Sequence, residues 1–399
     1  MDLLQPVVRP YAWGSRYGIA TLQGRPVPAP GPEAELWMGA HPSAPSGLER
    51  DGRPTTLDAV IAADPGTELG PDCVARFGSR LPFLLKVLSA EQALSIQLHP
   101  SRSQAEAGFR AENERGLAPG DPARNYVDDW PKPELLCALT PFEALAGLRT
   151  PADAAGILRA LAVDQLQPLA AGLEHGTSDL RGVLASVLCW PEVGRRQLVR
   201  RVVEACQWLA SADGPYAGAC TAALREASEH PGDLGVVALL LMRHTVLEPG
   251  EAVFMPAGGL HAYLRGTGIE VLANSDNVVR AGLTSKHVDV PELIKLVDPA
   301  ITVPVLSPRP LAQGVTGFDT PAPEFRMYLV QVSAEALPIP GTGPRILLCA
   351  GGAMTLRNSS GDTLKLGQGE SGFVSAADGP AWCTGPAYAV LAAPGNAAA

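Results

Sequence analysis

Histidines are the natural starting point for chemistry in this chain, because a neutral imidazole is a common metal ligand. The chain has seven, and none follows His287. His99 ends the segment SIQLH, which begins at Ser95. Alternate side chains of a strand share one face, so Ser95, Gln97 and His99 would lie together. We interpret Gln97 and His99 as half of a metal site; the alternative is a polar strand face close to a turn.

His261 and Glu134 lie in two other segments with defined local geometry. Residues 249–259, PGEAVFMPAGG, are typical of a turn, a strand and a loop that returns the chain into a second strand at His261. Tyr263 would share the face of His261. Glu134 ends the segment DWPKPE, in which two prolines restrict the backbone and direct Lys132 and Glu134 to one side. The alternatives are a buried histidine bonded to backbone groups and an exposed proline turn with an ion pair.

A third segment, 268–289, places polar and charged side chains between apolar ones. Polar groups at this density need partners if they are buried. We interpret Arg280 and Lys286 as a cationic cradle for an anionic ligand, with the Glu270 carboxylate nearby. The alternative is a turn with solvated charges. Lys86, inside the apolar run LLKVL, is either desolvated with altered basicity or extended to the surface. The polar residues of the segment include Glu270, Asn274, Asp276, Asn277, Arg280 and Lys286.

Short β-strands are predicted to position these residues. Gly and Pro break up about 150 residues at each end of the chain, as turns between strands do. Strands are expected at 81–89, 93–99 and 250–258, and helices from Thr56, from Ser101 and over 289–298. From about 150 to 245, including GVVALLLMRH, apolar residues recur every three or four positions, which predicts several helices divided by prolines. The remainder has a barrel or sandwich pattern, without the βαβ alternation or glycine loop of nucleotide-binding folds.

The overall composition limits the possible partners. The chain has 399 residues, of which 46% are apolar and 18% charged, which favours a folded protein of two or three domains. A net charge of -10 disfavours binding to nucleic-acid backbones. The seven cysteines are scattered and show no CxxC pair, and we find no signal pattern and no run of about 20 apolar residues. We therefore expect a cytoplasmic protein that binds neither nucleic acid nor membrane.

The chemistry-bearing segments resemble, in order along the chain, the shared blocks of the type I mannose-6-phosphate isomerase (phosphomannose isomerase) family of the cupin superfamily. The PGE…P…H pattern that ends at His261 is also similar to the cupin barrel signature. The resemblance covers about residues 1–310 and is carried by YAWGS (11–15), ELWMGAHPSAPS (35–46), LPFLLKVLSAEQALSIQLHP (81–100), NYVDDWPKPELLCALTPFEAL (125–145) and HAYLRGTGIEVLANSDNVVRAGLTSKHVDVPEL (261–293).

The resemblance implies a mainly β fold, with cupin or jelly-roll β-barrel domains and an inserted α-helical domain. On this basis residues 1–148 and 248–310 would be two parts of one catalytic β domain. Residues 149–247 would be the helical domain. Residues 311–399 would be a C-terminal β-barrel domain without metal ligands.

The resemblance also implies one zinc ion per chain, held by Gln97, His99, Glu134 and His261. The reaction would be interconversion of D-mannose 6-phosphate and D-fructose 6-phosphate by proton transfer through an enediol. Glu270 is the expected base, because an ionised carboxylate can carry a proton whereas arginine stays protonated. The predicted catalytic residues are Glu270, Lys132 and Arg280, and the predicted substrate-binding residues are Lys286, Tyr263, Ser95, Lys86 and Asp276.

Two other functions remain open at this stage. A metal-dependent cupin oxygenase would also use an open histidine and carboxylate site, but it gives no role to the cations Lys132, Arg280 and Lys286. A sugar-phosphate-binding protein would need the cations without the complete ligand set. We expect a monomer whose partner is a small sugar phosphate.

Overall fold

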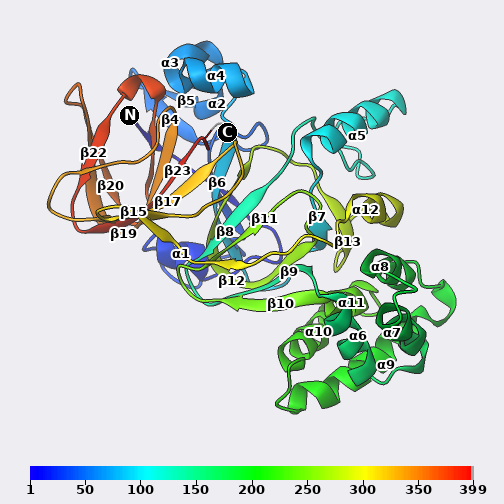
Figure 1. Ribbon diagram of the computed structural model, residues 1–399. Helices are drawn as coiled ribbons and strands as arrows, with labels where there is room; N and C mark the ends of the chain where they lie inside the picture. The colour runs from blue at the N-terminus through cyan, green and yellow to red at the C-terminus, as the bar shows by residue number, and fades with distance from the viewer. Residues whose placement is uncertain (397–399) are drawn as a thin grey trace.

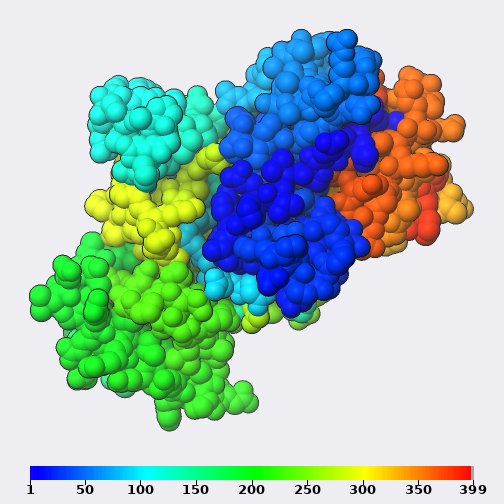
Figure 2. Space-filling model, turned by 180° about the vertical axis from the view of Figure 1, so that it is seen from behind, coloured from blue at the N-terminus to red at the C-terminus, as the bar shows by residue number. Residues whose placement is uncertain are grey.

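The computed structural model describes residues 1–396 and arranges them as three groups of elements in a row (Figure 1). A set of antiparallel strands forms the middle. A block of helices lies at one end, and a second antiparallel sheet lies at the other. The view from behind shows the same order, with the helical block in green and the C-terminal sheet in orange (Figure 2). The middle group contains every predicted site residue.

The middle sheet is built from strands on both sides of the helical block in sequence. Its main path runs β14-β11-β8-β12-β6-β3-β2, and β7, β9, β10 and β13 join it as a second group that shares β12. The bounds are β2 (Val7–Arg9), β3 (Glu35–Met38), β6 (Phe83–Ala90), β7 (Ile96–Leu98), β8 (Glu134–Ala138), β9 (Phe142–Leu148), β10 (Met242–Leu247), β11 (Ala252–Met255), β12 (His261–Ala273), β13 (Val279–Gly282) and β14 (Val305–Leu306).

Strand β12 connects the two groups because it bends at Gly266. Before the bend it pairs with β7 and β9, and after it with β6 and β8. Gly266 has φ +126°, and a Cβ atom there would lie 2.7 Å from the carbonyl oxygen of Pro141. Only glycine fits such a corner. One strand therefore delivers His261 to one group and Glu270 to the other.

Strand β6 is buried on both faces over its full length. The predicted strand at 81–89 is thus confirmed within two residues, because a continuous apolar run suits a strand covered on both sides. Lys86 lies at its centre, where the sequence places a single charge among apolar residues. The predicted strand at 93–99 is shorter and comprises only β7.

The helical block lies between β9 and β10 in the chain. It contains α6 (Pro151–Ala160), η1 (Asp164–Leu166), α7 (Gln167–Glu174), α8 (Leu180–Leu188), α9 (Glu192–Ser211), α10 (Ala217–Glu229), α11 (Gly235–Ala238) and η2 (Leu239–Leu241). Its apolar faces pack with Leu98 of β7 and Leu264 of β12 in one core. The predicted helix over GVVALLLMRH was wrong at its end: Met242 begins β10, because the edge of β9 offers hydrogen bonds that outweigh the helical pattern.

The C-terminal sheet also includes the first strand of the chain. Asp2–Leu4 (β1) pairs with β21, which the sequence did not predict. The other strands are β15 (Arg309–Ala312), β16 (Val315–Gly317), β17 (Arg326–Val332), β18 (Leu337–Pro338), β19 (Arg345–Asn358), β20 (Thr363–Gly367), β21 (Ser371–Val374), β22 (Ala381–Thr384) and β23 (Ala387–Ala393), with η3 at Ala376–Asp378. This sheet shares a core with the middle sheet through residues such as Leu85 and Val390.

The remaining elements are short. They are α1 (Gly18–Leu22), β4 (Gly47–Arg50), β5 (Arg53–Thr56), α2 (Leu57–Ala63), α3 (Pro65–Leu69), α4 (Pro71–Phe77), α5 (Arg102–Glu114) and α12 (Val290–Leu296). The helices predicted from Thr56, from Ser101 and over 289–298 are α2, α5 and α12. Ser101 closes a capping box with Gln104. Within residues 1–396, no helix is long and apolar enough to span a lipid bilayer.

Candidate metal centre and substrate cavity

Three buried side chains meet where β7, β8 and β12 come together. His99 follows β7, Glu134 begins β8 and His261 begins β12. Nε2 of His99 lies 3.3 Å from Glu134 Oε1, and Nε2 of His261 lies 3.4 Å from Glu134 Oε2. All three residues are almost completely buried: His99 is 1% exposed, His261 0% and Glu134 2%. Two imidazoles and a carboxylate, with ligand atoms within 4.8 Å of one another, form a candidate metal centre.

The protonation of the two rings shows why this group fits a cation. Nδ1 of His99 lies 2.7 Å from the carbonyl oxygen of Asn277, and Nδ1 of His261 lies 3.1 Å from that of Gly259. A carbonyl oxygen only accepts, so each Nδ1 donates. Burial lowers the pKa of His99 to about 4, so this ring is neutral at pH 7 and its Nε2 presents a lone pair to Glu134.

Lone pairs that face one another in a buried site repel unless a cation lies between them. Among residues 1–396, His99 Nε2 and Glu134 Oε2 have no hydrogen-bond partner. Buried polar atoms are rarely left in this state. The donor set of nitrogen and oxygen atoms suits a divalent ion such as zinc in an open, catalytic type of site.

Gln97 lies beside this group on β7. Its Cα is paired with that of His261, and its Nε2 lies 3.5 Å from His261 Nε2. Its Oε1 accepts a hydrogen bond of 3.1 Å from the Ser95 hydroxyl. A half-turn of the amide exchanges oxygen and nitrogen at almost no change in shape. Gln97 can therefore offer an oxygen as a fourth ligand, the role that the family resemblance implied.

Lys132 places a positive charge next to the carboxylate. Its Nζ lies 3.0 Å from Glu134 Oε1, and both side chains are buried. Burial opposes ionisation of Glu134, but Lys132 and His99 hold the pKa of this carboxyl well below its usual range. Glu134 is therefore ionised at neutral pH, as a metal ligand must be.

A second charged group lies on β3, β6 and β12. Lys86 is 6% exposed, so it is desolvated and does not extend to the surface. Its Nζ lies 3.6 Å from Glu270 Oε2 and 3.8 Å from Glu35 Oε2, and Glu35 also accepts a hydrogen bond of 2.6 Å from Trp37 Nε1. Burial favours the neutral amine, but Glu35 and Glu270 raise the pKa of Lys86. Lys86 therefore stays charged between two carboxylates.

Glu270 has the properties of a proton carrier. Burial, and then the charge of Glu134, raise the pKa of Glu270 to about 8. A buried carboxyl group with a pKa near the working pH can both take and return a proton. On the same strand, burial and then Glu270 raise the pKa of Tyr263 well above its usual range.

A cavity of about 660 Å³ is lined by Glu35, Lys86, Gln97 and Lys132, whereas His99, Glu134, His261 and Glu270 lie outside its lining. Arg280 on β13 and Lys286 in the following loop both line it. Among residues 1–396, neither cation forms an ion pair, and the Lys286 Nζ lies 5.6 Å from the centre of the Tyr11 ring. Burial and the charge of Arg280 lower the pKa of Lys286. Two cations that repel one another in a cavity form an anion site.

Of the predicted substrate-binding residues, all but Tyr263 line this cavity. Its lining includes Lys86, Ser95, Gln97, Lys132, Asp276, Arg280 and Lys286. Tyr263 is fully buried and does not line it; its ring centre lies 5.6 Å from that of His261.

Sequence reasoning missed two residues that orient the site. His41 Nε2 lies 3.3 Å from Asp276 Oδ2 and, despite burial, lowers the pKa of Asp276. For His41, the only indication in the sequence was that the segment ELWMGAHPSAPS, which contains it, resembles the family. Asn277 is fully buried; its Oδ1 accepts from the backbone N–H groups of Val127 and Asp128, and its carbonyl holds His99. Here the density of polar residues in 268–289 was the signal.

A jelly-roll type of β-fold with a buried His–Glu–His group and a cationic cavity defines a cupin-type metal protein. The model of the family described as phosphomannose isomerase type I, catalytic domain, matches residues 1–151. Mannose-6-phosphate isomerase of Escherichia coli strain K12 is 38% identical over 385 residues, covering 95% of this chain and 96% of that protein. The protein of the same name from Rattus norvegicus is 34% identical and covers 82% of this chain and 81% of its own length.

Solved structures agree with the sequence comparisons. A crystal structure of a mannose 6-phosphate isomerase bound with zinc and yttrium has a TM-score of 0.88 and 33% identity, covering 99% of this chain and 100% of that one. The enzyme from Salmonella typhimurium bound to fructose 6-phosphate and zinc has a TM-score of 0.89, again with 33% identity and with 99% and 100% coverage. The chain belongs to the type I phosphomannose isomerase family.

Proposed function

We infer that this protein is a zinc-dependent isomerase that interconverts D-mannose 6-phosphate and D-fructose 6-phosphate. One observation carries this inference: buried ligand atoms of His99, Glu134 and His261 converge, with His99 Nε2 and Glu134 Oε2 lacking a hydrogen-bond partner among residues 1–396, beside a cavity lined by Arg280 and Lys286. The family relatives named as isomerases, and one crystallised with zinc and fructose 6-phosphate, support the same activity. Neither an oxygenase nor a pure binding protein accounts for both parts of the site and these relatives.

We propose Gln97, His99, Glu134 and His261 as the zinc ligands. Zinc in this place would act as a Lewis acid that stabilises negative charge developing on the substrate oxygens. The backbone carbonyls of Asn277 and Gly259 fix the two histidines in the tautomer that leaves Nε2 free. Lys132 keeps Glu134 ionised through the 3.0 Å contact described above.

Glu270 is the proposed base of the reaction. In the open-chain aldose it removes the proton on C2; the C–H electron pair forms the C1–C2 double bond, and the carbonyl electrons move to O1. A proton then passes from O2 to O1 as the C2 carbonyl forms, and Glu270 returns its proton to C1. Lys86, 3.6 Å away, favours the ionised form of Glu270 that starts the cycle. Arg280 is proposed to stabilise the negative charge of the enediolate.

Lys286 is proposed to bind the phosphate, with Ser95, Lys86 and Asp276 contacting the sugar. Tyr263, predicted to bind substrate, is buried against His261, and we propose that it supports this ligand instead. The division at 148, 247 and 310 is retained as the proposed domain organisation. The scattered free cysteines favour a reducing compartment such as the cytoplasm, and we propose a monomer without nucleic-acid or membrane partners.

The test of this function is direct. Purified, zinc-loaded protein should convert D-mannose 6-phosphate to D-fructose 6-phosphate, and His261→Ala should lose this activity together with its bound zinc. Equal inactivity of both proteins over a range of divalent metals would contradict the isomerase assignment. Oxygen consumption with iron-loaded protein would instead favour the oxygenase.

A further inference from the structure

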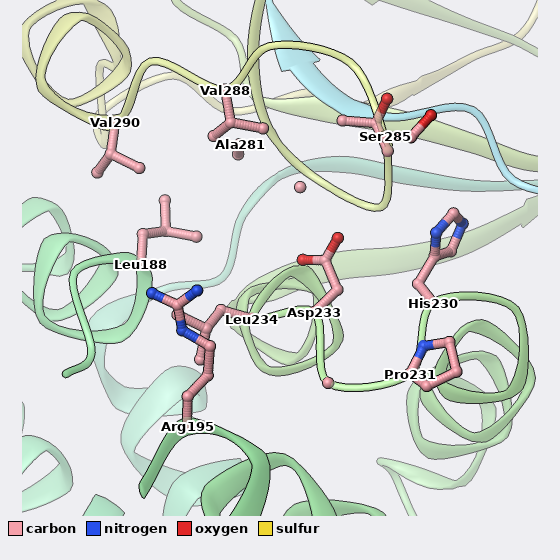
Figure 3. A pocket seen from close by; sticks show the side chains of 13 residues that line it. Leu188, Arg195, His230, Pro231, Asp233, Leu234, Ala281, Ser285, Val288 and Val290 are labelled. Atoms are coloured by element: carbon pink, nitrogen blue, oxygen red, sulfur yellow. The ribbon is translucent and has the colours of Figure 1, made fainter. Parts of the chain in front are cut away.

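Asp233, outside the cavity, holds the loop that carries Lys286. It lies in the turn between α10 and α11 of the helical block. Its Oδ2 accepts a hydrogen bond of 2.9 Å from the backbone N–H of Leu283, 50 residues away, and its Oδ1 accepts one of 2.7 Å from the N–H of Gly235. Figure 3 shows the Asp233 carboxylate pointing at the segment between Ala281 and Ser285. Within residues 1–396 it forms no ion pair, so both oxygens serve backbone groups.

The backbone at Leu283 needs such a restraint. Leu283 is buried and has φ +54°, a left-handed conformation that a leucine rarely adopts. On both sides of the contact the backbones touch: a Cβ on Gly235 would lie 2.7 Å from the Leu283 nitrogen, and one on Gly282 would lie 2.8 Å from the Gly235 Cα. The helical block is therefore fitted closely to this one point of the loop.

The loop has little other support. It separates two cavities, the substrate cavity of about 660 Å³ and a second of about 550 Å³ on the side of Leu188, Arg195 and Asp233. Thr284 and Ser285 line both. Within the described part of the chain, the backbone N–H groups of 283–288 that donate hydrogen bonds are those of Leu283, to Asp233, and of Lys286, to Thr284 Oγ1. Leu283 packs into the core of the helical block, whereas residues 285–287 are exposed and have no packed core to fix them.

The position of this loop matters because Arg280 precedes Leu283 by three residues and Lys286 follows it by three. We propose that Asp233 is a positioning residue for substrate binding: it fixes Leu283 and thereby holds Lys286 at the distance that a phosphorylated sugar requires from Arg280, which the pairing of β13 with β7 holds in place. This inference rests on the proposed function for its substrate. Asp233 lines neither the substrate cavity nor the group of metal ligands, so its effect on substrate binding passes through the loop.

Asp233→Ala removes both acceptors, and Asp233→Asn keeps the shape while replacing one acceptor with an NH₂ group. The matched control is Asp179→Ala, which removes a carboxylate that accepts a 2.7 Å hydrogen bond from the Gly182 N–H at the start of α8, in the same block but away from the loop. Two readouts are needed: KM and kcat for D-mannose 6-phosphate, and amide hydrogen exchange of the peptide 281–288 with zinc bound.

We expect Asp233→Ala to speed exchange of the Leu283 amide by about tenfold or more, since a hydrogen bond to a charged acceptor is lost. We expect KM to rise by about fivefold or more, with kcat changed less than threefold and zinc content unchanged. Asp233→Asn should shift both readouts in the same direction by less, and it serves as the test if the alanine variant fails to fold. Asp179→Ala should leave KM and loop exchange as in wild type.

Two results would overturn the proposal: faster loop exchange with an unchanged KM, or an equal rise of KM in Asp179→Ala, which would show only a general loss of stability. An inactive wild-type protein would refute the isomerase function, and the exchange measurement would still decide whether Asp233 holds the loop. Unchanged exchange in both Asp233 variants would refute the restraint itself.

Discussion

Lys286 gives the sharpest test of how the cavity recognises its ligand. The residue is a largely exposed cation at the cavity edge, and it pairs with no carboxylate within residues 1–396. Its pKa is lowered by the partial burial of its side chain and by the charge of Arg280. A phosphate dianion would remove this repulsion. Lys286→Met keeps most of the length of the side chain and removes the charge.

The expected size of the effect follows from this environment. A hydrogen bond to a charged group is worth about 1.5–3 kcal/mol, and the lower end applies because Lys286 is exposed. About 1.4 kcal/mol corresponds to a tenfold change in affinity. KM for D-mannose 6-phosphate should rise roughly tenfold. Because the phosphate is bound alike in the ground state and the transition state, kcat should change by less than about threefold.

The assay measures turnover of D-mannose 6-phosphate and of D-mannose, each over a range of salt concentrations. The matched control is Lys295→Met, because Lys295 is exposed on α12 and pairs with Glu292 at 3.1 Å, away from the substrate cavity. The KM of wild type should also increase with salt, and that of Lys286→Met less so. A KM within twofold of wild type, or equal losses for mannose and its phosphate, would refute the phosphate role of Lys286.

The remaining predictions concern the base, the metal and its support. Because Glu270 must lose its proton to act, kcat/KM should rise with pH and reach half of its plateau near pH 8, and Glu270→Gln should have little activity and no such rise. Zinc at 100 times its Kd should add about 2.7 kcal/mol to the free energy of unfolding, and a chelator should remove it; His261→Ala should show neither change by calorimetry. Asn277→Ala should weaken zinc binding by about 10- to 100-fold in a competitive chelator titration, because the side-chain bonds to residues 127–130 that fix the backbone at 277 are lost, and the carbonyl of residue 277 then no longer orients His99. Wild-type affinity in this variant would contradict that link.

Several features of the fold followed from local pattern. The apolar run around Lys86 predicted β6, and Ser101 with Gln104 marked the start of α5, because both signals lie within a few residues of the element. The end of the helical block did not follow, since Met242–Leu247 pairs with β9 almost 100 residues earlier. The placement of β1 in the C-terminal sheet was equally invisible, because its partner β21 lies at the other end of the chain.

The site likewise combines features that the sequence predicts locally with contacts that depend on the tertiary structure. The sequence by itself determined the common face of Gln97 and His99, because a strand has a period of two. The ordered resemblance added Glu134 and His261. Only the tertiary structure decided that Lys86 is buried between two carboxylates, that Tyr263 lies behind the cavity wall, and that Asp233 reaches Leu283. Such contacts depend on strand register and on the bend at Gly266, which bring together residues far apart in the chain and which no local pattern encodes.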